Sequence, residues 1–288
     1  VVRHLTARVA AADPAAARYV HWGATSQDIM DTGLVLQLRA AVAVVCEHLT
    51  NAADAAADLT RRYADAPMAG RTWLQQATPV SFGLKAAGWL DALDRTRRRV
   101  DVALDDAQVL QFGGATGTLA SLGSEGPAVA DALARRLCLR TADTPWHAHR
   151  DRLAQLGCTL GVATGAVGKI ARDLGLMAQT EVREAWAQRV DGRGGSSTMP
   201  HKQNPAGMSV ALAAAARAPA RRGWSRGPPP RARRAPPRAS RRRALKAWTG
   251  QLYTWHAASF AFVTLCRARR VLRAHRARRV PRVRRGLC

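Results

Sequence analysis

Three long stretches of the chain repeat apolar residues at three- and four-residue spacing, and this periodicity restricts the fold most. They are residues 34–62, residues 79–111, opened by Pro79, and residues 149–190; a shorter Ala-rich helix is expected at 206–217. The stripe of the first stretch consists of Leu34, Leu38, Val42, Val45 and Leu49. Helices this long can bury such stripes only against one another. The pattern therefore predicts an all-α protein built as an elongated bundle of long helices.

The segments between these helices are expected to be loops. No stretch between residues 1 and 220 alternates apolar and polar residues as a strand does. Residues 112–126 are rich in glycine but lack the GxxxxGK[ST] pattern of a phosphate-binding loop, and they are interpreted as a connection. Asp31 or Thr32 is expected to cap the first long helix.

Charge is distributed very unevenly along the chain. The formal net charge is +25. Residues 1–220 hold 24 Lys and Arg and all 20 Asp and Glu, whereas residues 221–288 hold the other 21 basic residues and no acidic one. The later sequence is also rich in proline and shows no periodicity, so it cannot form a packed core. We expect a helical domain at residues 1–219 and a disordered or misframed Arg/Pro-rich tail at residues 220–288.

The basic tail has two interpretations. Twenty-one cations without an acid would bind a phosphate backbone in a salt-dependent way, so that the chain would act as a nucleic-acid-binding module. Alternatively, the helical pattern stops within a few residues of Ala220 because the reading frame changes. Together with a start that lacks Met, this favours an N-terminally truncated and C-terminally misframed chain, which would be an inactive fragment if too much of the core is lost.

The five cysteines are scattered and form neither a CxxC pair nor a zinc-like cluster with histidine. Scattered cysteines of this kind are typical of proteins in the reducing cytoplasm, and their spacing does not indicate a metal site. No run of about 18 apolar residues indicates a membrane span.

Three polar segments lie beside the expected long helices. The first is HWGATSQD at residues 21–28, the second GRTWLQQATP at residues 70–79, and the third GGSSTMPHKQNP at residues 194–205. Each combines hydroxyl and amide side chains with glycine or proline, and polar loops at helix ends can bind anions through backbone N–H groups.

The third segment carries the most specific chemistry. Ser196 and Ser197 offer hydroxyl groups, and Lys202 supplies a cation that can activate a serine or stabilise a developing oxyanion. Asn204 adds an amide donor. The residues alone leave a second interpretation open, in which the segment is a Ser/Gly linker before a helix.

The three segments together resemble the shared regions of the fumarase/aspartase superfamily. GSSTMPHKQNP matches the fixed positions of its Gly-Ser-Ser-x-Met-Pro-x-Lys-x-Asn-Pro signature loop, and the first segment matches its His-x-Gly-x-Thr-Ser-x-Asp region. The resemblance covers about residues 1–219. It implies a long-helix bundle, a small polycarboxylate substrate, and a homotetramer whose active sites are shared between subunits. It implies no cofactor and no metal.

Trp73 separates the subgroups within this superfamily. The lyases usually carry Thr-His in the second region, where this chain has Thr72-Trp73. The Trp-containing sequence resembles the bacterial 3-carboxy-cis,cis-muconate cycloisomerases, which form a lactone. This implies a cycloisomerase rather than an adenylosuccinate lyase-like β-elimination enzyme, which is kept as the alternative.

The resemblance implies specific roles for residues of the three segments. Ser196 is expected to donate and accept the proton, assisted by Lys202. His201, in the variable position of the loop, is expected to be non-catalytic, and His147 or His149 is a candidate for a further acid or base. The expected substrate-binding residues are Thr25, Ser26, Arg71, Gln75, Asn204, His21, Trp73, Ser197 and Met199.

Overall fold

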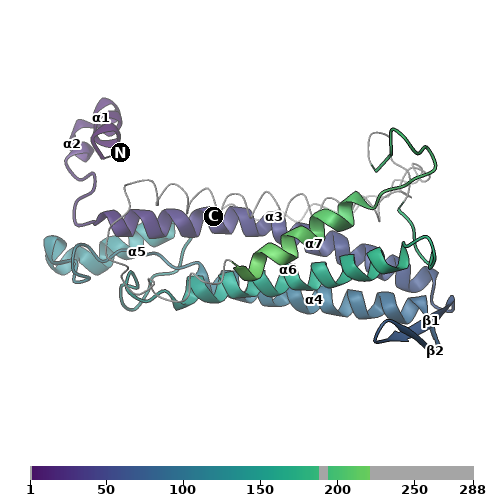
Figure 1. Ribbon diagram of the computed structural model, residues 1–288. Coiled ribbons are helices and arrows are strands. Elements are labelled where there is room, and N and C mark those ends of the chain that lie inside the picture. The colour runs from purple at the N-terminus through teal and green to yellow at the C-terminus, as the bar shows by residue number, and fades with distance from the viewer. Residues whose placement is uncertain (1, 188–193, 221–288) are drawn as a thin grey trace, which may run out of the picture. The chain divides into compact units, whose positions relative to one another are not determined.

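The computed structural model describes residues 2–187 and 194–220 (Figure 1). The expected tail at residues 220–288 lies outside the described residues from position 221 onward. The helices are α1 (Val2–Ala12), α2 (Pro14–Ala17), α3 (Ser26–Arg62), α4 (Phe82–Ala107), the short 3₁₀ helix η1 (Ala120–Glu125), α5 (Gly126–Leu137), α6 (Asp151–Met177) and α7 (Ala206–Ala220). Two strands, β1 (Pro67–Thr72) and β2 (Gln75–Ser81), complete the described elements.

The described residues fall into two compact units, and α3, α4 and α6 each contribute to both. The first unit contains residues 1–40 and 103–154, with α1, α2 and α5. Its core is formed by α5, the start of α3 and the segments that follow α4 and α5. The buried residues of this core are Val35, Val109, Leu110, Ala130, Ala134, Leu139 and Trp146.

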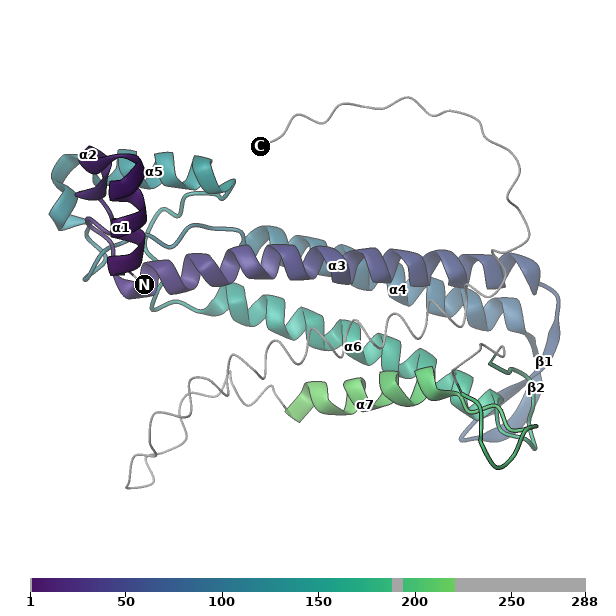
Figure 2. The same cartoon turned by 90° about the horizontal axis from the view of Figure 1, so that it is seen from above.

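The second unit contains residues 41–102 and the described residues from 155 onward. In it α3, α4 and α6 run side by side, and α7 lies along α6 (Figures 1 and 2). Trp89 on α4 is buried and donates its indole N–H to Asp173 on α6 at 2.8 Å. The close approach of α6 and α7 depends on Gly168, because a Cβ there would lie 2.4 Å from the Cβ of Ala215. The expected bundle of long helices is confirmed.

The first apolar stripe is buried as expected. Leu38, Val42, Val45 and Leu49 are all at most 3% exposed, whereas Leu34 is only half-buried. The stripe therefore identifies the packed face of α3, as an amphipathic helix requires.

Several boundaries differ from the sequence-based expectations. α3 begins at Ser26, so that Asp31 and Thr32 lie inside the helix and do not cap it. Pro79 lies in β2 and not at a helix start; α4 begins at Phe82, where the Ser81 hydroxyl accepts the N–H of Leu84 at 3.1 Å. α6 ends at Met177, well short of residue 190.

The expectation of no strand before residue 220 was wrong. β1 and β2 form an antiparallel hairpin with an irregular register between Ala69 and Arg71. Most of its side chains are exposed on both faces. A hairpin that buries a single side chain, Met68, needs no regular alternation of apolar and polar residues, and so the sequence lacks the signal.

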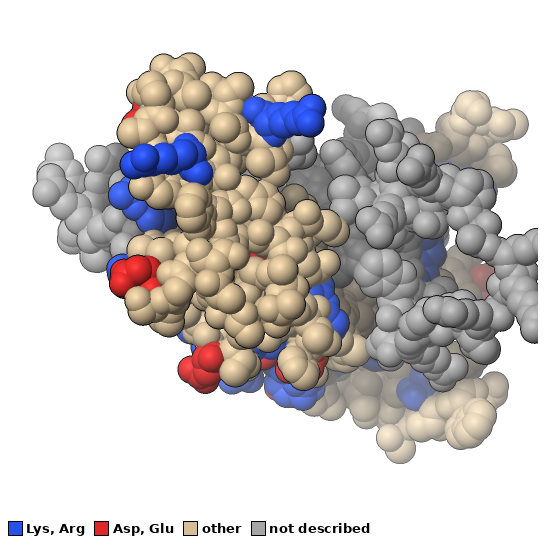
Figure 3. All heavy atoms as spheres, turned by 90° about the vertical axis from the view of Figure 1, so that its left-hand side faces the viewer, with Lys and Arg blue, Asp and Glu red and all other residues tan. Residues whose placement is uncertain are grey.

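Two further properties are the apolar character of the long helices and the distribution of charge on the surface. α3 and α6 are long and apolar enough to cross a membrane by length and composition alone, a test that buried core helices also pass. In α6 half of the apolar window is buried within the protein. On the face shown in Figure 3, uncharged surface predominates, with basic and acidic side chains both present.

Candidate functional site

The first segment forms an irregular turn that leads into α3. His21 and Gly23 both adopt positive φ, at 67° and 71°. A Cβ on Gly23 would lie 2.6 Å from the side chain of Leu122, so glycine is required there. Thr25 stands immediately before α3, and Ser26 is its first residue. Neither hydroxyl forms a hydrogen bond within the part of the chain that the structure describes, and both are free to bind an anion at the positive end of the helix.

Asp28 is the central residue of this turn, although its role was not expected. Its carboxylate is 1% exposed and accepts four N–H groups. These come from Thr25, from the Gln111 side chain and from the backbone of Gly113 and Gly114, at 2.9–3.1 Å. The glycine-rich connection that follows α4 is thus held against the first segment.

A second buried carboxylate lies one turn further along α3. Asp31 forms a two-bond ion pair with Arg150, at 2.6 and 2.9 Å. The Arg150 guanidinium also lies over the ring of Trp146, 5.3 Å from its centroid. His147 is half-buried beside the network, with Nδ1 3.4 Å from the Gln111 amide nitrogen, whereas His149 is exposed. Of the two candidate histidines, His147 is the one adjoining the first segment's hydrogen bonds.

The second segment forms the hairpin β1–β2, and Trp73 and Leu74 make its two-residue turn. Both have positive φ, 50° and 64°, which costs free energy for residues other than glycine or asparagine. Trp73 is 96% exposed, and Gln75 beside it is also exposed. Strain and full exposure of a large apolar side chain at one turn are features of sites that act on a ligand or partner.

Arg71 forms an ion pair with another residue of the second unit. Its guanidinium forms two hydrogen bonds with the Glu184 carboxylate, at 2.7 and 2.9 Å. Hydrogen bonding to Glu184 raises the pKa of Arg71 above its already high usual value. The pair fastens the hairpin to the segment after α6, so a substrate carboxylate would have to share or displace Glu184.

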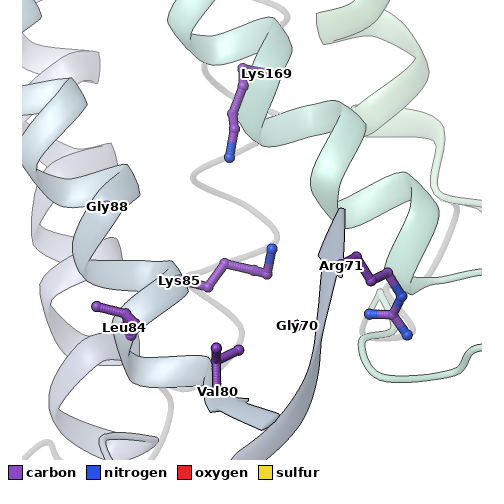
Figure 4. A pocket seen from close by; sticks show the side chains of 7 residues that line it. All are labelled: Gly70, Arg71, Val80, Leu84, Lys85, Gly88 and Lys169. Atoms are coloured by element: carbon purple, nitrogen blue, oxygen red, sulfur yellow. The ribbon is translucent and has the colours of Figure 1, made fainter. Parts of the chain in front are cut away.

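A cavity of about 360 Å³ lies between the hairpin, α4 and α6. In Figure 4 the ammonium groups of Lys85 and Lys169 point toward this space, whereas the Arg71 guanidinium points away. Lys169 is paired with Asp173. The cavity is therefore bordered by three cations, of which Lys169 and Arg71 are each paired with a neighbouring carboxylate.

The third segment is a closed loop before α7. The backbone N–H of Asn204 donates to the carbonyl of Gly194 at 2.7 Å, and a Cβ on Gly194 would lie 2.6 Å from the Asn204 carbonyl oxygen. Within the loop the Ser196 hydroxyl accepts the N–H of Met199 at 3.1 Å, and the N–H of Lys202 donates to the Met199 carbonyl at 3.0 Å. The loop thus holds Ser196 and Lys202 on one short, closed backbone path.

The candidate residues are divided between the two units. His21, Thr25 and Ser26 belong to the first unit, as does His147. The hairpin and the closed loop both belong to the second unit. Within that unit Ser196 and Asn204 are partly exposed, and the exposed members are Arg71, Trp73, Gln75, Ser197, Met199, His201 and Lys202.

Comparisons with known proteins show similarity to enzymes of a lyase family. A family model described as Lyase matches residues 2–219. The chain is 53% identical over 219 residues to a 3-carboxy-cis,cis-muconate cycloisomerase of Pseudomonas aeruginosa, covering 76% of this chain and 48% of the relative. It is 44% identical over 226 residues to a nitrosuccinate lyase of Streptomyces davaonensis, covering 76% and 48%.

A solved structure resembles the fold as well. The 3-carboxy-cis,cis-muconate lactonizing enzyme from Pseudomonas putida matches with a TM-score of 0.79 and 40% identity, over 92% of this chain and 58% of that one. The chain spans about half the length of the curated relatives it matches.

Proposed function

Because this chain belongs to the lyase family whose model matches residues 2–219, we propose that it carries the activity of a 3-carboxy-cis,cis-muconate cycloisomerase. The observation that carries the proposal is Trp73 on the hairpin turn, within a chain 53% identical to such an enzyme. An indole cannot exchange protons, so the second segment has no acid or base at this position and the proton must be handled elsewhere.

The proposed reaction is an intramolecular addition. A carboxylate oxygen of the substrate bonds to one carbon of a C=C double bond and closes the lactone ring. The π electrons move to the neighbouring carbon, next to another carboxylate, and a proton is then delivered to that carbon. The intermediate is an aci-carboxylate with extra negative charge, and stabilising this charge is usually the largest catalytic contribution.

Ser196 is the proposed proton donor and acceptor. A free serine hydroxyl is a very weak acid, and it needs a nearby cation and N–H groups to act. Lys202 and Asn204 lie on the same closed loop and would hold the aci-carboxylate. Ser197 and Met199 complete the loop's surface for the substrate, while His201 is left outside the chemistry.

The remaining segments would bind the other carboxylates. The free hydroxyls of Thr25 and Ser26 at the start of α3 suit one carboxylate, with His21 as a neighbouring donor. Gln75 suits another. Arg71 would bind a substrate carboxylate only by sharing or displacing Glu184, with which it is paired. Trp73 would shape the pocket and exclude water.

We also propose a homotetramer with shared active sites, acting in the cytoplasm on a product of aromatic-compound breakdown. The exposed Trp73 supports this, because a large apolar side chain at a hairpin tip is stabilised when another subunit covers it.

A β-elimination lyase is the second candidate. It is favoured by the 44% identity to a nitrosuccinate lyase. Elimination uses the same carbanion chemistry in the reverse direction, so the loop residues would keep their roles. The two candidates differ in whether a group leaves the substrate.

The test is the loss of absorbance of 3-carboxy-cis,cis-muconate with the purified 288-residue chain, beside Ser196→Ala. We expect turnover that the variant reduces by about a hundredfold to ten-thousandfold, as for loss of a proton-transfer group. Sedimentation analysis of both proteins controls for assembly. A folded tetramer without turnover contradicts the cycloisomerase, and nitrosuccinate is then the substrate to assay.

A further inference from the structure

We propose that Asp28 is the positioning residue of the substrate-binding turn, a role that rests on the proposed function of Thr25 and Ser26. Its buried carboxylate joins this turn to the glycine-rich connection after α4. No cation lies within ion-pairing distance of it among residues 2–187 and 194–220. It is therefore held by directed N–H donors and not by a countercharge.

The geometry fixes which atom binds which donor. Oδ2 accepts the N–H of Thr25 and of Gly114, both at 2.9 Å. Oδ1 accepts the Gln111 amide at 2.9 Å and the N–H of Gly113 at 3.1 Å. Each oxygen thus receives two donors, one of them from the glycine-rich connection. The carboxylate spans two segments that are far apart in the sequence.

Gln111 extends the same network. It is 1% exposed, and its Oε1 accepts the backbone N–H of Trp146 at 2.6 Å. Because an N–H must face Oε1 and a carboxylate must face Nε2, the orientation of the amide is determined. Its backbone also exchanges two hydrogen bonds with the Thr32 hydroxyl, at 2.9 and 3.1 Å. Asp28 is therefore anchored to a rigid, fully paired neighbour.

This anchoring determines what Thr25 presents to a ligand. At an ordinary helix start the hydroxyl of the capping residue is used to pair the first N–H groups. Here Asp28 takes the Thr25 N–H, whereas the Thr25 hydroxyl forms no hydrogen bond to another described residue. The turn before it has positive φ at His21 and Gly23, and it is closed by a long backbone hydrogen bond from the Ala24 N–H to the His21 carbonyl at 3.3 Å. We infer that Asp28 orients the hydroxyls of Thr25 and Ser26 toward a substrate carboxylate.

The test compares Asp28→Asn with Asp31→Asn. The amide keeps the size of the side chain, but its NH₂ group faces two N–H donors, so the turn loses two hydrogen bonds. Asp31 is the matched control: it is 2% exposed on the same helix and is bonded to Arg150 instead. Both variants lose a buried carboxylate, and only Asp28→Asn weakens the network of N–H donors that includes Thr25.

We expect Asp28→Asn to raise the KM for 3-carboxy-cis,cis-muconate about tenfold or more with a smaller fall in kcat, because ground-state binding is lost. Asp31→Asn should lower the melting temperature similarly and leave KM within about twofold. Equal KM values for the two variants, or a KM unchanged in Asp28→Asn, would overturn the proposal.

Hydrogen exchange gives a readout that is independent of turnover. In Asp28→Asn the remaining oxygen keeps two donors and the NH₂ group faces the other two, so the amides of either Thr25 and Gly114 or else Gly113 should exchange faster, with the rest of α3 unchanged. An inactive wild-type chain would refute the proposed function alone. Unchanged exchange at these three amides would refute the positioning role of Asp28, whatever the activity.

Discussion

At the scale of single residues, Lys202 tests the closed loop most directly. Its side chain is exposed, so removing its charge should leave the fold intact. We expect Lys202→Gln to lower kcat about a hundredfold or more, because the aci-carboxylate loses its cation. Steady-state kinetics and thermal unfolding measure the two effects. His201→Ala is the control on the neighbouring exposed position, and an equal loss of activity there would mean that the loop is merely disturbed.

Cys46 gives a pH-dependent prediction. Burial raises the pKa of its thiol to about 12, and its hydrogen bond to Asp101 adds to this effect. The thiolate is the reactive form, so labelling should be slow at pH 8 and increase with pH up to about 12. Iodoacetamide at pH 8, read by peptide mass spectrometry, should modify the exposed Cys138 and Cys158 at least about tenfold faster. Labelling of all three at one rate would contradict the burial of Cys46.

At the scale of elements, the helices were predictable and the hairpin was not. A stripe such as Leu38 and Val42 follows from burying one helix face, which the sequence must encode. The β1–β2 hairpin buries only Met68, and its turn of Trp73 and Leu74 lacks the Asn-Gly signal of a two-residue turn. The turn has positive φ at both residues, a conformation that Trp and Leu disfavour. The sequence preferences of these residues therefore do not predict it.

The candidate site could be predicted only in part for a related reason. Ser196, Lys202 and Thr25 stand in motifs with distinctive spacing. Asp28 stands in the first of these motifs too, but its partners Gln111 and Gly113 lie more than eighty residues away. Only the tertiary structure brings them together. The one local sign was the Gly-rich character of the connection, which we interpreted as a plain loop.

Leu74 tests the strain in the hairpin turn. Glycine adopts a φ of 64° without steric cost, and Leu74 is 74% exposed, so little packing is lost. We expect Leu74→Gly to stabilise the protein by about 1 kcal/mol, a rise of about 2–4 °C in melting temperature. Calorimetry measures this. Thr72→Gly, at an exposed position within β1, should instead destabilise it, and a matching rise there would exclude strain relief as the cause.

Gly168 tests the packing of α7 on α6. A larger side chain would collide with Ala215, whose methyl group cannot rotate away. We expect Gly168→Ala to destabilise the protein by about 1–3 kcal/mol in urea unfolding. It should also lower activity, because α7 follows directly on Asn204 and Pro205.

The same helix supplies the control for Gly168. A Cβ on Gly165 would have no atom within 4 Å. Gly165→Ala should therefore stabilise α6 by about 0.5–1 kcal/mol through helix propensity alone. If both variants were equally stable, α6 and α7 would not be in close contact.

At the scale of the whole molecule, the division of site residues between two units leads to a prediction about assembly. Thr25 and Ser26 belong to the first unit, and Ser196 to the second. If each active site combines segments from different subunits, one inactive subunit can supply the segment that another lacks. Two inactive variants, Ser196→Ala and the double variant Thr25→Ala, Ser26→Ala, should then restore activity when their subunits are exchanged.

The expected recovery is quantitative. With equal amounts of the two variants, half of the subunits offer each intact segment, and about a quarter of the sites receive both in a randomly mixed oligomer. Co-expression followed by the absorbance assay should therefore give about a quarter of the wild-type rate per site. Mixing the variants without subunit exchange controls for residual activity of either one. Recovery that stays at the level of that control would mean that the segments meet within one subunit, because only a site shared between subunits can be completed by mixing.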